Sequence, residues 1–116
     1  MTKATYWQRG ETLDYKNTTD TTIEANTIIS FGGHIGIAGT DIFPDELGSL
    51  HVTGVFEIPK TTTEAIEMGT VVYFDGEGIT NAEDDGETSP TAYPLAGYAA
   101  QAAAASDTVI LVKLGG

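Results

Sequence analysis

The sequence predicts an all-β fold: a small β-sandwich or partly open barrel with one short helix and an extended N-terminal arm. Threonine and glycine are abundant, with 14 glycines among 116 residues, whereas leucine, lysine and arginine are scarce. This composition favours strands and tight turns over helices. Short runs of β-forming residues also alternate with turn residues along the chain, which is typical of a sandwich or a barrel.

Three strands are predicted before residue 40, over Glu11–Tyr15, Thr27–Phe31 and His34–Ala38. Gly32 and Gly33 separate the last two as a two-residue hairpin turn. The clearest strand is Leu50–Ile58, in which one face carries Leu50, Val52, Gly54, Phe56 and Ile58. Strict alternation over nine residues predicts a single half-buried strand. Pro59 ends it, because proline has no amide hydrogen for a strand ladder.

A short helix is predicted over Thr61–Met68. Thr62 or Thr63 provides an N-cap, and Gly69 fits the stop signal. The alanine run Ala99–Ala105 has helical propensity, but its flanks favour a strand end followed by a turn, with a short helix as the alternative. Four further strands are predicted: Val71–Phe74, one that begins at Ile79-Thr80, Leu95–Ala100 and Thr108–Leu114.

Thr108–Leu114 is apolar and β-branched almost throughout, which predicts a strand covered on both faces. Asp75–Gly78 is predicted as a turn, because its residues tolerate positive φ. Asn81–Pro90 is acidic with Ala82 as its one apolar residue, so it is predicted as a solvated loop.

The predicted organisation is an N-terminal arm over residues 1–10 and a single β-rich domain over residues 11–116, with no linker and no internal repeat. A chain of this length can bury one core without staples. There is no cysteine, no stretch approaching the ~18 apolar residues of a membrane span, and no apolar segment at the N-terminus typical of a secretory signal.

Tyr6 and Trp7 are large aromatics in the polar arm, beside Arg9. One interpretation packs Trp7 against the edge of the domain's own core. The other is an arm that orders on meeting a partner, since aromatic residues bury much area for little rotamer entropy.

The net charge of −12 comes from seventeen acidic and five scattered basic residues. We therefore expect no direct nucleic-acid binding and no attachment to anionic membranes, because both need clustered cations. We interpret the acidity mainly as a source of solubility, because like charges keep copies of the chain apart. The alternative is that it attracts a basic partner surface or cations.

No motif carries a known chemistry. The glycine-rich stretch from Gly32 to Gly39 lacks the Gly-Lys pair of a phosphate-binding loop, and no serine lies in a G-x-S-x-G elbow. His34 and His51, the two histidines, have no metal-binding spacing. We therefore expect no cofactor, no metal and no catalytic residue.

Weaker alternatives remain open. The acidic segments at residues 75–77 and 84–87 could bind a cation, although the spacing of a calcium loop is absent. A small hydrolase could pair His51 with Glu57. A carbohydrate-binding sandwich could use the aromatic faces of Tyr73, Tyr93 and Tyr98.

Three segments in fixed order carry a resemblance: Gly54–Lys60 (GVFEIPK), the Val72–Asp75 element (VYFD), and the Gly97–Leu114 region with its alanine run and final strand. In these segments the chain resembles the capsid decoration, or cement, proteins of tailed phages, a family formerly of unknown function and misleadingly described as recombinase-like. The similarity extends from about Gly10 to Leu114. The acidic insert at Asn81–Thr91 is longer than the family pattern.

The resemblance implies a bacteriophage structural protein of the virion, made in the host bacterial cytoplasm, that binds the outside of the expanded shell. The implied partner is the major capsid protein, and the implied oligomer is a homotrimer that stabilises the shell against packaged DNA. On this basis we expect Tyr6, Trp7 and Arg9 to contact the capsid or a neighbouring subunit. The alternative function is a β-sandwich module for host-surface carbohydrate.

Overall fold

The computed structural model describes residues 2–115, and within them it contains nine β-strands and no α-helix. The predicted all-β class is therefore confirmed, whereas the predicted short helix is wrong. The strands belong to one open sheet, and the sandwich arrangement stays a prediction. They are β1 (Thr12–Lys16), β2 (Ile28–Phe31), β3 (His34–Ala38), β4 (Leu47–His51), β5 (Val55–Pro59), β6 (Val71–Phe74), β7 (Ile79–Thr80), β8 (Leu95–Ala99) and β9 (Val109–Leu114).

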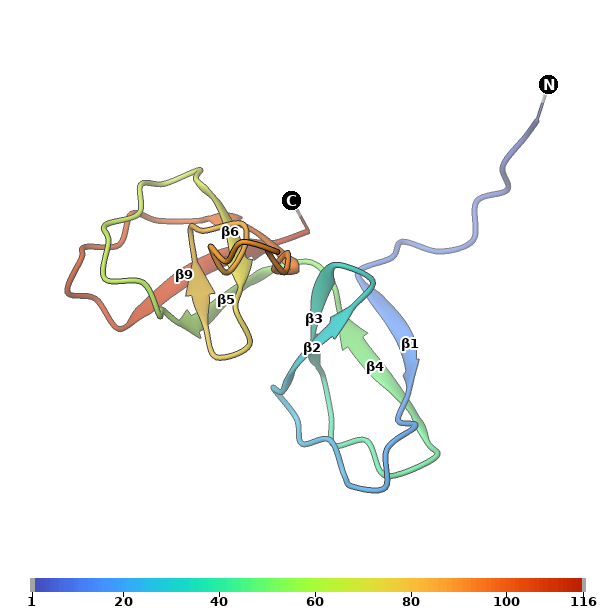
Figure 1. Ribbon diagram of the computed structural model, residues 1–116. Coiled ribbons are helices and arrows are strands. Elements are labelled where there is room, and N and C mark those ends of the chain that lie inside the picture. Colours follow the sequence, from blue (N-terminus) through green and yellow to red (C-terminus); the bar gives the residue numbers. More distant parts are fainter. Residues whose placement is uncertain (1, 116) are drawn as a thin grey trace.

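The strands are grouped in two lobes that lie side by side, with the N-terminal segment extending away from them (Figure 1). We call residues 11–52, with β1 to β4, the first module, and residues 54–114, with β5 to β9, the second module. A short parallel pairing between β3 and β8 links their sheets, where the amide of Leu95 donates to the carbonyl of Gly33 at 2.8 Å.

The two modules repeat the same strand pairing. In the first, β1 pairs with β4, β4 with β3, and β3 with β2, all antiparallel. In the second, β5 pairs with β9, β9 with β8, and β8 with β6, again all antiparallel. The strands β1, β2, β3 and β4 thus correspond to β5, β6, β8 and β9, and β7 belongs to an insertion in the second module.

The connections repeat as well. An antiparallel bridge joins Ile23 to Ile42 in the first module, and a matching bridge joins Ile66 to Ala103 in the second. A four-residue turn follows each of these bridge residues, closed by a hydrogen bond from its fourth amide to its first carbonyl. The four turns cover residues 24–27, 43–46, 67–70 and 104–107.

The strand pairing repeats, whereas the sequence analysis predicted no internal repeat. The third turn position shows why: it holds Asn26, Asp45 and Gly69 in three of the turns, all with positive φ. Asparagine, aspartate and glycine tolerate this backbone conformation better than other residues. Different residue types can therefore occupy equivalent turn positions, and the repeat is not visible as sequence similarity.

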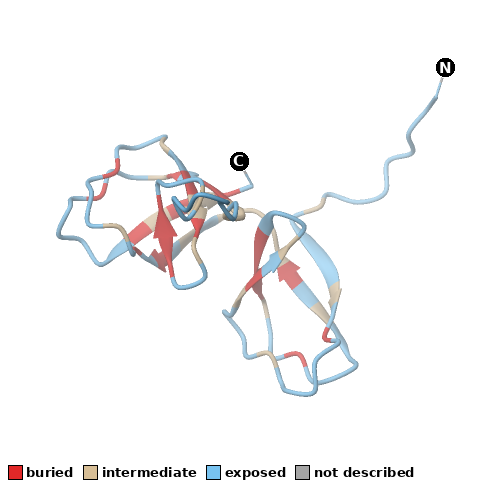
Figure 2. Ribbon diagram, viewed as in Figure 1, coloured by how far each residue is buried: buried red, intermediate tan, exposed pale blue. Residues whose placement is uncertain are grey.

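Each module has its own buried cluster, visible as a separate set of buried strands in Figure 2. Among the described residues, the first module's cluster is small: Ile29, Ala38, Ile42 and Leu50 are buried, with Tyr15, Ile23, Phe31 and Val52 partly buried around them. The second module's cluster is larger and also takes in Ile35 and Ile37 of β3, so the first module covers part of the second module's core.

The segment predicted as a helix, Thr61–Met68, is instead a bend followed by a bridge and a turn. The Thr62 hydroxyl does accept the amide of Glu64, as a cap would, at 3.2 Å. The amide of Ile66, however, donates to Ala103 across the module rather than to a residue one helical turn back. Gly69, at φ 89°, is the third residue of the turn over residues 67–70 and not the end of a helix.

The predicted single strand Leu50–Ile58 is two strands, β4 and β5, one in each module. Gly54 has a φ of 113°, which a β-strand does not use, so the chain changes direction there. Because residues on both sides of the break keep the alternation, the pattern conceals it.

The remaining strands agree with the predictions to within a residue or two. The alanine run is a strand end followed by a turn, as predicted, and not a helix. The prediction that Thr108–Leu114 is covered on both faces is wrong: Ile110, Val112 and Leu114 are buried, but Val109 on the opposite face is 42% exposed.

Candidate functional site

Residues 2–10 form the most exposed part of the described chain. They lie outside all strands, and the side chains of Tyr6 and Trp7 are 79% and 88% exposed. The interpretation in which Trp7 packs on the domain's core is therefore wrong for this structure. Two contacts hold the base of the segment: Gln8 donates to the carbonyl of Thr12 at 3.3 Å, and Arg9 lies 3.5 Å from Glu11.

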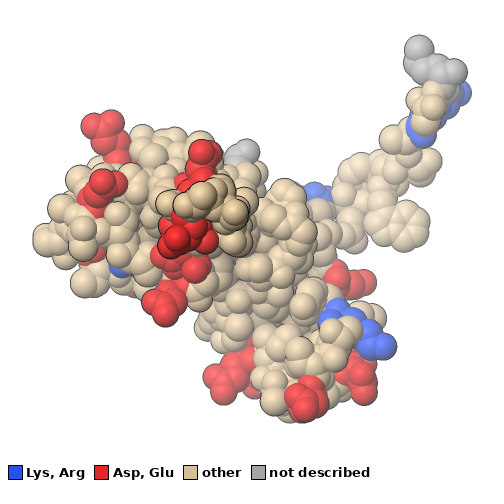
Figure 3. All heavy atoms as spheres, in the orientation of Figure 1, with Lys and Arg blue, Asp and Glu red and all other residues tan. Residues whose placement is uncertain are grey.

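The N-terminal segment and the modules differ in charge. Lys3 and Arg9 are two of the chain's five basic residues, and residues 1–10 contain no acidic one. The acidic side chains are spread over both modules (Figure 3). A cationic, aromatic segment thus projects from an acidic body, which suits contact with an oppositely charged surface while copies of the body repel one another.

The two histidines lie against aromatic rings. His34 is exposed and its ring centroid lies 5.9 Å from that of Phe31, while His51 lies 6.1 Å from Phe56. Over residues 2–115 there is no group of three or more histidine, aspartate or glutamate side chains placed to hold a metal ion. The His51–Phe56 ring contact lies where the first module meets the second.

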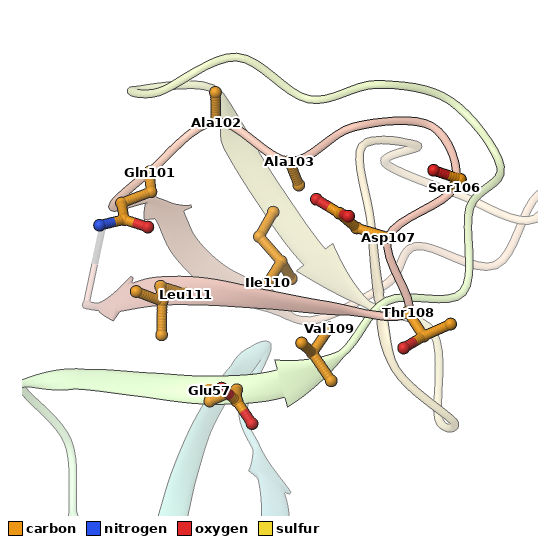
Figure 4. A pocket seen from close by; sticks show the side chains of 10 residues that line it. All are labelled: Glu57, Gln101, Ala102, Ala103, Ser106, Asp107, Thr108, Val109, Ile110 and Leu111. Atoms are coloured by element: carbon orange, nitrogen blue, oxygen red, sulfur yellow. The ribbon is translucent and has the colours of Figure 1, made fainter.

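A groove of about 430 Å³ lies beside the start of β9. The loop that follows β8 forms one wall, and Glu57 of β5 lies beneath β9 on the other side (Figure 4). Asp107 already accepts the amide of Ala104 at 2.8 Å, which closes this loop. The lining holds no histidine, lysine or arginine, and its ionisable side chains are the carboxylates of Glu57 and Asp107. Sequence analysis did not find this groove, because its lining carries no motif.

The acidic insertion of the second module surrounds a smaller pocket of about 250 Å³. Tyr73 and Tyr93, two of the three tyrosines considered for carbohydrate binding, both line it, whereas Tyr98 does not. Partial burial, with the charges of Asp75, Asp85 and Asp84, raises the pKa of the Tyr93 phenol. Glu83 and Asp84 line this pocket together with the two tyrosines.

The acidic turn at residues 84–87 is held by local hydrogen bonds. Asp84 accepts the amide of Gly86 at 2.9 Å, and Asp85 accepts the amides of Glu87 and Thr91. These backbone hydrogen bonds lower the pKa of Asp85 below its usual range. Both carboxylates are thus engaged in shaping the loop.

The three segments that carry the family resemblance all lie in the second module. Gly54–Lys60 contains β5, the VYFD element ends β6, and Gly97–Leu114 spans the end of β8 through β9. They contribute to its sheet and core. Lys60, for example, is 8% exposed and donates from its ammonium group to the carbonyls of Thr62 and Ala105.

Comparison with known families gives a match to the family model described as phage cement protein, over residues 7–114. The chain belongs to the phage cement protein family. This match covers both modules and begins within the N-terminal segment, at Trp7. No curated protein and no solved structure matches the chain.

Membership of the cement family indicates a capsid-associated role, a location in the virion capsid and a structural rather than an enzymatic protein family. Within residues 2–115, no helix is long and apolar enough to cross a membrane.

Proposed function

We propose that this cement protein binds the outside of the expanded major-capsid shell and reinforces it against the pressure of packaged DNA. Membership of the cement family carries the proposal. A second support is that the described residues offer exposed aromatic and apolar surface, as in Tyr6, Trp7 and Val55. Many weak contacts repeated over a lattice bind firmly by avidity, so no deep pocket is needed.

In this proposal residues 1–10 are a binding arm and residues 11–116 a single decoration domain; Met1 and Gly116 lie outside the described residues. Tyr6, Trp7 and Arg9 contact the capsid or a neighbouring subunit. Their support is the high exposure of both aromatic rings and the positive charge of the arm against an acidic body. Aromatic and arginine side chains are the commonest anchors of protein interfaces. Copies assemble as a homotrimer on the shell exterior, after synthesis in the host cytoplasm.

The test is co-sedimentation with expanded heads that lack the protein. We expect saturable binding at a fixed copy number per shell and a gain in head stability. Deleting Thr2–Arg9, or changing Trp7→Ala, is expected to weaken binding at least tenfold, which corresponds to about 1.4 kcal/mol. Met68→Ala is the matched control, because Met68 is 71% exposed and lies in a turn away from the arm.

Wild-type affinity in the arm-deleted variant would remove the role of the arm, and no binding by the intact protein would remove the capsid role itself.

A second function, binding of host-surface carbohydrate, is favoured by the pocket that Tyr73 and Tyr93 line. An array of host glycans with no bound member would reject it.

A further inference from the structure

The sheet of each module has two faces that can be compared position by position. The inner face carries the side chains of the module's own buried cluster, and the outer face carries the alternate residues. Register places Thr12, His51, Ile37 and Ile28 in one row on the outer face of the first module. The equivalent row on the second module is Val55, Lys113, Tyr98 and Val71.

In the first module the outer face is covered by the second module. Ile37 is 3% exposed, because it packs with Ile35 into the second module's cluster. His51 contacts the ring of Phe56, which lies on the inner face of the second module. Within one chain, the outer face of the first module therefore packs against the inner face of the second module.

In the second module the equivalent outer face is uncovered, although it carries several apolar residues beside Lys113 and Glu57. Val55, Val71 and Tyr98 are 55%, 50% and 39% exposed. Strand β9 adds two residues to the same face: Val109, which is exposed, and Leu111, which is half-buried. An apolar strand face without a cover is a common mark of an interaction site.

The first module has the complementary gap. Its inner face is only partly covered: Leu13 is 38% exposed and Tyr15 and Phe31 are partly buried, although Ile29, Ala38 and Leu50 on the same face are buried. The equivalent residues of the second module, Phe56, Ile58 and Phe74, line the face that the first module covers. Each chain thus presents an uncovered outer face on its second module and a partly open inner face on its first module.

We propose that the outer face of the second module binds the inner face of the first module of a second copy of this chain. This contact repeats, between chains, the joint that connects the two modules within a chain. It is a head-to-tail contact, so successive copies close into a ring if the rotation allows it and extend as a filament otherwise. The number of copies rests on the proposed trimer, in which a ring would contain six modules; the contact itself does not depend on capsid binding.

The correspondence predicts which residues meet. His51 and Phe56 are in contact within the chain, and their equivalents are Lys113 and Leu13. Leu13 of one copy should therefore lie beside Lys113 of the next. The chain has no cysteine, so cysteines introduced at these two positions report on this contact without background.

The experiment mixes two single variants, Leu13→Cys and Lys113→Cys, one of them labelled with ¹⁵N so that mass spectrometry distinguishes mixed from self-linked dimers. Oxidation is carried out in concentrated solution and on decorated heads. We expect mixed disulfide dimers in several-fold excess over both self-linked dimers, and closed covalent rings from the double variant. Met68→Cys mixed with Leu13→Cys is the control, and should give no excess.

A random distribution of dimers in both settings, or a dominant self-linked Lys113→Cys dimer, would overturn the head-to-tail contact. Val71→Asp provides a second readout that needs no cysteine: it should abolish concentration-dependent association in sedimentation velocity, whereas Met68→Asp should not. Unchanged association of the folded Val71→Asp protein would also overturn the proposal. Head binding is scored separately, so mixed cross-links without head binding would reject the capsid role and keep this contact.

Discussion

The two modules share one arrangement of strands and turns but differ in the residues that maintain it. Asn17 and Lys60 follow β1 and β5, and both are buried. The Asn17 amide donates to the carbonyls of Thr21 and Ile42, while the Lys60 ammonium donates to those of Thr62 and Ala105. The requirement at this position is a donor for two buried carbonyls, and either side chain meets it.

The modules also differ in what surrounds them. The first module connects β2 to β3 through Gly32 and Gly33, whereas the second places an acidic insertion with β7 between β6 and β8. The second module's core is covered by a neighbour and the first module's is not. The shared strand order therefore sets the fold, and the surroundings decide which module is the more stable.

The largest difference is expected at a pair of equivalent glycines, Gly97 and Gly36. At Gly97, φ is 146° and an added Cβ would overlap the carbonyl oxygen of Lys113, so Gly97→Ala separates β8 from β9. At Gly36 the obstacle is the side chain of Leu50, with its Cγ 2.6 Å away, and that side chain can shift. We expect Gly97→Ala to cost more than about 4 kcal/mol and Gly36→Ala about 1–3 kcal/mol.

Chemical denaturation of both variants, followed by circular dichroism, measures the two free energies of unfolding. Equal losses would show that the two glycines are not equivalent in packing, and would weaken the module comparison. Gly76→Ala is the control for backbone strain alone, because Gly76 has a φ of 100° but no atom within 4 Å of an added Cβ.

The next largest difference is expected at Ile37 and Tyr98, which occupy the same position of the two outer faces. Ile37 is covered by the second module, so Ile37→Ala leaves a cavity and should cost about 2–4 kcal/mol. Tyr98 is exposed, and Tyr98→Ala should change the stability of the monomer by less than about 0.5 kcal/mol. Thermal unfolding at low protein concentration compares them, and a large loss for Tyr98→Ala there would mean that the face is already covered within one chain.

The sequence predicted the strands well where each run of β-forming residues lies within one module. His34–Ala38 and Val71–Phe74 match the observed bounds. Each is a short run of β-forming residues close to glycines that mark turns. Leu50–Ile58 was predicted as one strand because alternation carries no information about a chain reversal at Gly54. The helix at Thr61–Met68 was predicted from local signals, whereas the amide of Ile66 is taken by Ala103, a residue far along the chain.

The site was predictable only in part, for a similar reason. The aromatic residues of the arm stand out in the sequence, and Tyr6 and Trp7 are exposed as an interface role requires. The prediction for the outer face of β9 was wrong. The apolar run predicted a strand buried on both faces, but within one chain only the inner face of β9 is buried. That discrepancy between pattern and exposure is informative, because it points to a surface that a second molecule would bury.

The smallest difference between the modules is expected in their response to acid. It should appear at the Asp75–Gly78 turn of the second module, which has no ionisable equivalent in the Gly32-Gly33 turn of the first. Burial raises the pKa of Asp75, but hydrogen bonds from the Thr61 hydroxyl and the amides of Glu77 and Gly78 outweigh it, so the pKa lies below the model-compound value of 3.8. A lowered pKa stabilises the folded state above pH 3.8, and this contribution is lost as the pH falls through the folded-state pKa. The Gly32-Gly33 turn has no ionisable side chain and no such dependence.

We therefore expect the amides around Asp75 to lose hydrogen-exchange protection in acid before those around Gly32 and Gly33. In Asp75→Asn the acid dependence should become shallower, while the loss at neutral pH stays below about 1 kcal/mol because the amide oxygen still accepts hydrogen bonds. Asp85→Asn is the matched control, since Asp85 also has a lowered pKa but its hydrogen bonds stay within the acidic loop. If both hairpin tips lost protection together, acid would be acting on the shared sheet, and the two modules would unfold as one unit.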